Sequence, residues 1–394
     1  MALPESGTVL IEVPRQDGAS TQAAPQTPRA PRLALLDGLR FLAAVLVLLY
    51  HYTAWRHEFW GTPMAKDAWP ELSKFTLYGN MGVQLFFIIS GFVILLSAYG
   101  KSASRFVGSR VGRLYPAYWV AVLATGFLVI VMWPKLGEGR GIKELLANLT
   151  MFHPLMGMRH IDGVYWTLWI ELRFYLVILL LIMLRLLTIR GVTIFAVAWP
   201  LLGLGAQLMG NENATYLLMA EYAPLFAGGM MLFMIYRFGH SVRRWGILLF
   251  NVVLSAYFTG LKAPVEAMEL VGYVIAPWTY WLIVAGLFAA VAALSLTPLR
   301  NVQWKFLALA GSLTYPVYLL HQVWGWWLID QINPVLGKYL TLPIVMGIVF
   351  TAAYLVHRFV ERPLAKPLAT GTTKGLEFLG AQGKKLFSPV LQRR

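Results

Sequence analysis

The sequence predicts an all-α integral membrane protein, a bundle of about ten transmembrane helices with both termini in the cytoplasm. Of its 394 residues, 58% are hydrophobic and only 13% are charged, whereas a soluble domain carries about 25% charged residues. Its apolar runs are each close to the ~20 residues that cross a bilayer. Its basic residues lie on alternate loops, as expected when Lys and Arg collect on the cytoplasmic side.

Ten apolar runs, bounded by charged or Pro/Gly-rich loops, define the predicted spans. They are 34–55, 80–99, 115–134, 165–187, 191–209, 218–236, 245–261, 270–296, 306–329 and 340–360. An even number of spans places both ends of the chain on the same side of the membrane. Two outer loops are long, and they hold several tryptophans of the kind that form an interfacial belt.

Loop charges indicate which side is the cytoplasm. The four short inner loops contain no acidic residue. Their basic residues, including those at the ends of the flanking spans, are Lys101, Arg105, Arg110, Arg113, Arg185, Arg190, Arg237, Arg243, Arg244, Arg300 and Lys305. The outer loops carry acidic and basic residues in nearly equal number. The protein is therefore expected as a multi-pass protein of the inner (plasma) membrane.

Three regions follow from this assignment. Residues 1–32 are rich in Pro, Ala, Gln and Thr and lack the apolar segment of a signal peptide, so they are predicted to be a disordered cytoplasmic tail. Residues 33–362 form the predicted ten-helix membrane domain. Residues 363–394 are the predicted basic cytoplasmic tail.

Composition also excludes several classes of function. The chain has no cysteine, which excludes disulfides, a thiolate nucleophile and cysteine-ligated metals, and we expect no metal. Its net charge of +15 follows the cytoplasmic loops and is not gathered on a soluble module, so no nucleic-acid partner is expected. No nucleophile elbow, nucleotide-binding loop or zinc-protease motif occurs in a usable context.

The first span contains Arg40 and His51, eleven residues apart. In a helix this spacing places both side chains on one face, ~16 Å apart along the axis. Ionisable groups within a span are costly and are candidates for function. The alternatives are that Arg40 is a snorkelling anchor and that His51 is a hydrogen-bonded core residue.

Arg110 and Arg113 lie one helical turn apart just before the third span, near the expected position of Arg40. Three arginines around one opening would suit an anion clamp for phosphates, because guanidinium groups bind phosphate in a bidentate way. Ordinary sorting of positive charge to the cytoplasmic side explains the same residues equally well.

Further polar groups lie in the fourth and ninth spans. Glu171 and Arg173 are about one turn inside the fourth span, and the ninth places Tyr315, Tyr318 and His321 three residues apart on one face. Glu171 and His321, together with the histidine of the first span, would suit general-base chemistry on a hydroxyl. A structural hydrogen-bond network is the alternative.

Together these motifs resemble the acyltransferase-3 family of membrane acyltransferases. The likeness is carried, in order, by LDGLRFLAAVLVLLYH, GVQLFFIISGFVI, RVGR before LYPAYW, WTLWIELRFY, SLTYPVYLLHQ and VERP. It covers about residues 33–365, nearly the whole membrane part. Two departures are Thr314, where the family usually has serine, and the absence of a large hydrolase-like domain after the last predicted span.

The resemblance implies a ten-helix core that transfers an acyl group, often acetyl from acetyl-CoA, to a hydroxyl of a carbohydrate, a glycolipid or a glycosylated natural product. A transporter or flippase for an anionic lipid-linked glycan is the main alternative. The sequence does not specify the acyl chain, the acceptor or the oligomeric state. The expected roles are catalysis for His51, Arg40 and Glu171, acyl-CoA binding for Arg40, Arg110 and Arg113, and acceptor binding for His321, Tyr318, Tyr315 and Arg173.

Overall fold

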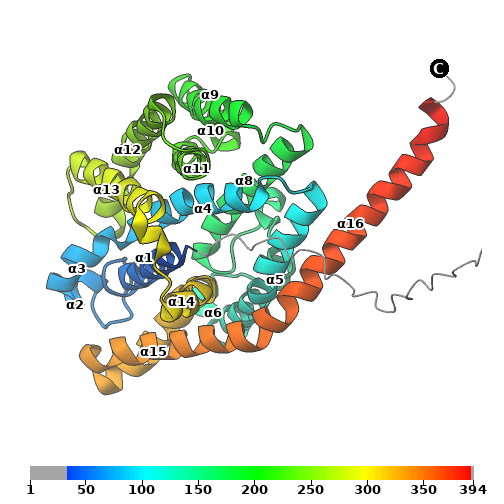
Figure 1. Ribbon diagram of the computed structural model, residues 1–394. Helices are drawn as coiled ribbons and strands as arrows, with labels where there is room; N and C mark the ends of the chain where they lie inside the picture. The colour runs from blue at the N-terminus through cyan, green and yellow to red at the C-terminus, as the bar shows by residue number, and fades with distance from the viewer. Residues whose placement is uncertain (1–32, 392–394) are drawn as a thin grey trace, which may run out of the picture. The chain divides into compact units, whose positions relative to one another are not determined.

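The computed structural model describes residues 33–391, with side chains through residue 382, and this part of the chain is helical without a β-strand. The predicted disordered tail, 1–32, lies outside the described residues. Each of the ten predicted spans coincides with a helix (Figure 1). These helices are α1 (Ala34–Thr53), α4 (Gly82–Ala98), α5 (Ala103–Phe127), α8 (Trp166–Met183), α9 (Ile189–Leu208), α11 (Ala223–Phe238), α12 (Val242–Leu270), α13 (Pro277–Leu296), α14 (Lys305–Leu336) and α15 (Lys338–Val356).

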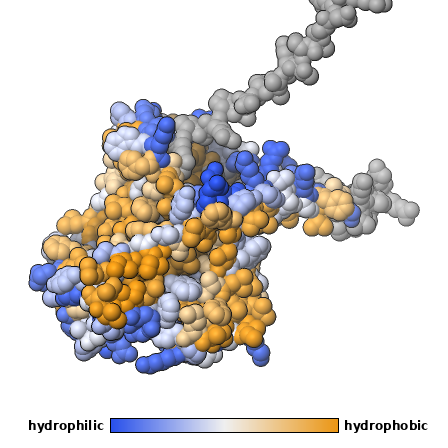
Figure 2. Space-filling view, turned by 90° about the horizontal axis from the view of Figure 1, so that it is seen from below, coloured by the Kyte–Doolittle hydropathy of each residue, from blue (hydrophilic) through white to orange (hydrophobic). Residues whose placement is uncertain are grey.

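Within the described part, eight helical segments are long and apolar enough to cross a membrane, and α11 is an apolar helix of 16 residues. Apolar side chains also cover large areas of the face shown in Figure 2, where they suit contact with lipid. The expectation of an all-α, multi-pass membrane protein is therefore confirmed. The count of ten spans and the cytoplasmic placement of both termini stay predictions.

Short helices fill the predicted outer loops and join the long helices. They are α2 (Ala65–Ala68), α3 (Pro70–Thr76), η1 (Leu77–Met81), η2 (Leu128–Met132), α6 (Pro134–Gly137), α7 (Ile142–Asn148), η3 (His153–Met156), η4 (Gly163–Tyr165), α10 (Glu212–Leu217), η5 (Pro298–Asn301) and η6 (His357–Glu361). The second long loop is ordered around Asn148, whose buried amide donates to the carbonyls of Glu144 and Arg159 and accepts from the amide of Ile161. These loops are folded parts of the molecule.

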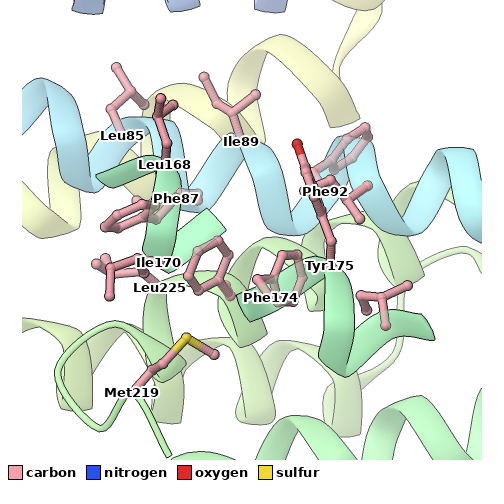
Figure 3. Close-up of a cluster of buried hydrophobic side chains, with 14 of the residues drawn as sticks. Leu85, Phe87, Ile89, Phe92, Leu168, Ile170, Phe174, Tyr175, Met219 and Leu225 are labelled. Carbon is pink, nitrogen blue, oxygen red and sulfur yellow. The ribbon is translucent and has the colours of Figure 1, made fainter. Parts of the chain in front are cut away.

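The core is built around α4, which packs against α1, α8 and α11. Figure 3 shows the apolar side chains of α4 and α8 meeting those of α11. The rings of Phe174 and Phe226 stack with centroids 4.2 Å apart. At the α4–α11 crossing, a Cβ on Gly91 would stand 2.2 Å from the carbonyl oxygen of Phe226, so only glycine permits this approach. The close packing holds α4 firmly beside the polar groups described below.

Helices α5, α12 and α14 extend well beyond their predicted spans. α5 begins at Ala103, where Ser102 caps it, so Arg110 and Arg113 lie on the helix itself. α12 continues to Leu270, although its predicted span ended at 261. Lys262 is charge-paired there with Glu221 at 2.8 Å. The predicted span began too late in α5 and ended too early in α12, because charged residues interrupt an apolar run without interrupting a helix.

The predicted basic tail is also helical. After η6, α16 runs from Arg362 to Leu391 and packs along α5. Figure 1 shows α16 passing beside α5 before it continues outward. No secondary structure was predicted for this segment, because its mixed small, charged and apolar residues do not form an apolar run.

Candidate active site

The histidines of α1 and α14 meet inside the bundle. The distance between His51 Nδ1 and His321 Nε2 is 3.1 Å, and the side chains are 7% and 0% exposed. Two bonds between the helices hold this register: the Tyr52 hydroxyl donates to the carbonyl of His321 at 2.7 Å, and Trp326 Nε1 donates to the carbonyl of His51 at 2.9 Å. The two residues are therefore close because their backbones are tied together.

The hydrogen bonds of the pair define which nitrogen carries each proton. His321 Nδ1 lies 2.8 Å from the carbonyl oxygen of Tyr318, and a carbonyl can only accept, so Nδ1 is the protonated nitrogen of a neutral His321. His321 Nε2 is then an acceptor for His51 Nδ1–H, which also points to the carbonyl of Val47 at 2.9 Å. Within the described part of the chain no hydrogen bond involves His51 Nε2, so its lone pair is free, the arrangement that a general base requires.

A cavity of about 210 Å³ adjoins His51. His321 does not line it and lies behind His51. The walls of the cavity include Trp55, whose ring centroid is 5.2 Å from that of His51, together with Asn80 and Gln84. Among the described residues, Asn80 Oδ1 and Gln84 Oε1 are buried and have no hydrogen-bond partner. Buried polar atoms in folded proteins are nearly always paired, so these two amides suit a polar ligand in this cavity.

Arg40 lies in a second, smaller cavity of about 50 Å³, which shares Val83 with the His51 cavity. Its Nε is buried without a hydrogen-bond partner in the described part of the chain. Glu171 lines this cavity and accepts a hydrogen bond of 2.9 Å from Ser90 of α4. Arg40 and Glu171 therefore lie in the same cavity, as expected of polar groups in a bundle interior.

The expected cluster of Glu171 with the two histidines is not formed, and this interpretation is corrected. α8 packs against α4 at Ser90, which directs Glu171 into the Arg40 cavity. No hydrogen bond in the described structure joins Glu171 to His51. The partner of His51 is a second imidazole, His321.

None of the four residues expected to bind the acceptor lines the His51 cavity. Tyr315 and Tyr318 line the Arg40 cavity, where the Tyr318 hydroxyl bonds to Thr167 at 2.8 Å. Arg173 turns toward α10, where it donates to the carbonyls of Tyr216 and Leu217 and stacks 4.3 Å from the Tyr216 ring centroid. The guanidinium of Arg173 is therefore bonded to α10 and does not contact the histidines. His321, the fourth of these residues, contacts His51 directly.

Arg110 and Arg113 lie together, as expected, in a third cavity of about 520 Å³. Arg110 packs over the rings of Phe106 and Tyr175, 5.7 and 5.6 Å from their centroids. This cavity shares Tyr315 with the Arg40 cavity. The Arg40 cavity thus shares one lining residue with each of the other two cavities. Arginines line the Arg40 cavity and the Arg110–Arg113 cavity, and His51 lines the remaining one.

Several polar residues that line the His51 cavity were not predicted from the sequence, among them Asn80, Gln84, Lys262 and Glu266. A signal for them was available. Asn80 and Gln84 are four residues apart at the start of an otherwise apolar span, and Lys262 and Glu266 have the same spacing on α12. Residues four apart share one face of a helix.

Outside the predicted spans, Asp162 connects the second long loop to α14 close to His321. Its carboxylate accepts from the amides of Val164 at 3.1 Å and Val323 at 3.4 Å. Burial raises the pKa of Asp162 to about 7. The ring of His57 lies 5.6 Å from that of Trp326, and burial lowers the pKa of His57 to about 4.

Comparison with known proteins agrees with the resemblance seen in the sequence. The family model described as an acyltransferase domain, of the acyltransferase-3 type, matches residues 33–358. The chain is 30% identical to acyltransferase MdmB of Streptomyces mycarofaciens over 155 residues, which are 38% of this chain and 39% of that protein. It is 30% identical to nodulation protein 10 of Rhizobium leguminosarum bv. viciae over 173 residues, 37% of this chain and 43% of that protein.

The matched segment thus spans about two fifths of each of these relatives. No solved structure matches this chain. The family model, however, covers most of the 394 residues and includes α1, α5, α8 and α14, which carry the sequence motifs. The chain therefore belongs to the acyltransferase-3 family.

Proposed function

We propose that this protein is an O-acyltransferase that moves an acyl group, acetyl in the first instance, from acyl-CoA to a hydroxyl of a carbohydrate, a glycolipid or a glycosylated natural product. It would do so in the inner (plasma) membrane. One observation carries the proposal: His51 has a free Nε2 beside a polar cavity, and its neighbouring cavities are lined by arginines. Membership of the family supports the same reaction.

In the proposed reaction, His51 Nε2 takes the proton of the acceptor hydroxyl as that oxygen attacks the thioester carbonyl. The carbon–sulfur bond then breaks, and the protonated His51 returns its proton to the departing CoA thiolate. The products are the acylated acceptor and free CoA. The hydrogen bond from His51 Nδ1 to His321 becomes charge-assisted while His51 is protonated, so His321 stabilises the imidazolium form.

The donor is assigned to the two arginine-lined cavities. Phosphates of CoA would bind Arg110 and Arg113, because guanidinium groups are well suited to phosphate. The pantetheine arm would then pass Tyr315 into the cavity of Arg40 and reach His51 beyond Val83. A distance of ~16 Å along α1 separates Arg40 from His51, which is comparable to an extended pantetheine chain.

The acceptor is assigned to the His51 cavity. Its unpaired amides, Asn80 and Gln84, can bond to hydroxyls, and its aromatic walls, Trp55 and Trp166, offer flat apolar faces. Lys262 and its two carboxylate partners add a charged rim on the α12 side. Hydroxyl-rich molecules with apolar ring faces fit this combination of groups, which supports a carbohydrate acceptor.

The test is CoA release by the full-length protein in detergent, with acetyl-CoA and a panel of glycosides, followed by mass spectrometry of each acceptor. We expect free CoA and an acceptor heavier by one acetyl group, both lost in His51→Ala. In reconstituted vesicles, movement of a lipid-linked glycan with no mass change and no CoA release would instead support a flippase.

A further inference from the structure

One wall of the Arg110–Arg113 cavity is formed by α16, which starts beyond the segment matched by the family model. This helix contributes Arg362, Lys366 and the small residues between and after them. The reaction proposed above uses nothing from α16. It nevertheless lies beside a cavity that is lined by Arg110 and Arg113 of α5.

The position of α16 is set by backbone contact with α5. A Cβ on Gly112 would stand 2.3 Å from the carbonyl oxygen of Ala365, and one on Gly108 would stand 2.6 Å from that of Ala369. Any side chain at either glycine would force the helices apart, because such distances are far below van der Waals contact. Arg362 and Lys366, four residues apart, are therefore held at this cavity.

Positive charge in the cavity exceeds what its own residues neutralise. Four cationic side chains line it: Arg110, Arg113, Arg362 and Lys366. Its carboxylate, Glu361, is hydrogen-bonded to His357 at 2.7 Å. Across the residues that the structure describes, no ion pair joins any of the four cations to a carboxylate. A cavity of about 520 Å³ with this charge suits a ligand with several phosphates.

The cations belong to two groups at different positions. Tyr315 lines both this cavity and that of Arg40, so the thioester end of a donor would lie on that side. Arg110 and Arg113 belong to α5, where Arg110 is partly buried and Arg113 is exposed, whereas the exposed Arg362 and Lys366 belong to α16. CoA has a matching order: a diphosphate next to the pantetheine arm, and a separate 3′-phosphate on its terminal ribose.

We propose that α16 forms the subsite for the 3′-phosphoadenosine end of the donor, with Arg362 and Lys366 binding its 3′-phosphate. This inference rests on the proposed use of acyl-CoA. It assigns the two arginines of α5 to the diphosphate. The enzyme would then prefer full acyl-CoA to dephospho-CoA thioesters and to pantetheine thioesters on a carrier protein, which lack the 3′-phosphate.

Calorimetric titration of the full-length protein in detergent with CoA and with dephospho-CoA tests this assignment. The wild type should bind CoA at least about 10-fold more tightly, as expected for one charge-assisted phosphate contact. In R362A/K366A, affinity for CoA should fall at least about 10-fold and affinity for dephospho-CoA should barely change, so the preference disappears. Lys374→Ala is the matched control, since Lys374 is exposed on the same helix and outside the cavity.

The outcomes separate this inference from the function on which it rests. If the wild type binds both ligands equally, or if the double variant keeps the preference for CoA, the 3′-phosphate subsite is not on α16 while the acyltransferase proposal stands. If Lys374→Ala weakens CoA binding as much as the double variant does, the effect is general surface charge and the subsite is refuted. If the wild type binds neither ligand and releases no CoA from acetyl-CoA, the proposed function fails as well.

Discussion

The paired imidazoles lead to a graded prediction for two substitutions. His51→Ala removes the proposed base, and general-base catalysis contributes about 10²–10⁴-fold to rate. His321→Ala removes only the group that accepts the proton of His51 Nδ1 at 3.1 Å. The carbonyl of Val47, 2.9 Å from the same nitrogen, still accepts that proton. His51 thus keeps its orientation and its free Nε2 without His321.

The cost of losing His321 follows from this geometry. A neutral hydrogen bond contributes about 1 kcal/mol, and one to a charged group about 1.5–3 kcal/mol. The part that strengthens as His51 becomes protonated is therefore about 0.5–2 kcal/mol, or roughly 2- to 30-fold in kcat. His321→Gln, whose amide oxygen can accept from His51, should recover part of this loss.

Steady-state CoA release at saturating acetyl-CoA gives kcat for wild type, His51→Ala, His321→Ala and His321→Gln. Equilibrium binding of CoA to each variant serves as the control for folding, and it should stay close to wild type. The order of loss should be His51→Ala, then His321→Ala, then His321→Gln. If His321→Ala abolishes turnover while His51→Ala keeps most of it, the base is His321 and the assigned tautomers are wrong.

Three further predictions concern the donor, the topology and the response to pH. R110A/R113A should raise the KM for acetyl-CoA at least about 10-fold, since each charge-assisted contact contributes about 1.5–3 kcal/mol. An unchanged KM at normal expression would mean that these arginines only set the membrane topology and do not bind the donor. A reporter fused after Arg394 should be active only in the cytoplasm and fusions within 135–160 only outside, whereas an externally active C-terminal fusion would refute the even number of spans. Burial lowers the pKa of His153 to about 4 and also lowers that of its partner His160, 2.6 Å away. Because the unfolded chain binds more protons below the ordinary histidine pKa of 6.5, the free energy of unfolding should fall as pH drops from about 6.5 toward 4. Thermal melting measured across this pH range should show the fall, and the fall should be smaller in H153Q/H160Q. An identical pH profile in that variant would contradict the assignment of the fall to this histidine pair.

Much of the helical architecture could be predicted because a bilayer imposes strong constraints on sequence. Each predicted span coincides with a helix, since apolar runs of about 20 residues have few alternatives in lipid. The pairing of Arg110 with Arg113 and the neighbouring positions of Tyr318 and His321 also followed from spacing along one helix. The ring centroids of the latter two are 5.4 Å apart.

Contacts between helices were harder to predict from the sequence. Glu171 was expected beside His51, yet it lies with Arg40 because its bond to Ser90 depends on how α8 packs against α4. Arg173 is bonded to α10, a contact that the sequence pattern did not indicate. Hydropathy also ended α12 before Lys262, because a charged residue lowers the local average even when it is paired across helices.

Composition, apolar run length and charge alternation are enough to specify a helical membrane protein, because lipid requires backbone hydrogen bonds to be satisfied within each span. The ordered motifs along the chain are enough to specify its family. Only the tertiary structure decided which polar groups meet: His51 with His321, Arg40 with Glu171, and the cations of α16 with those of α5. These contacts depend on the register and close packing of helices that are far apart in sequence. The helical period within one segment gives no information about how that segment packs against another.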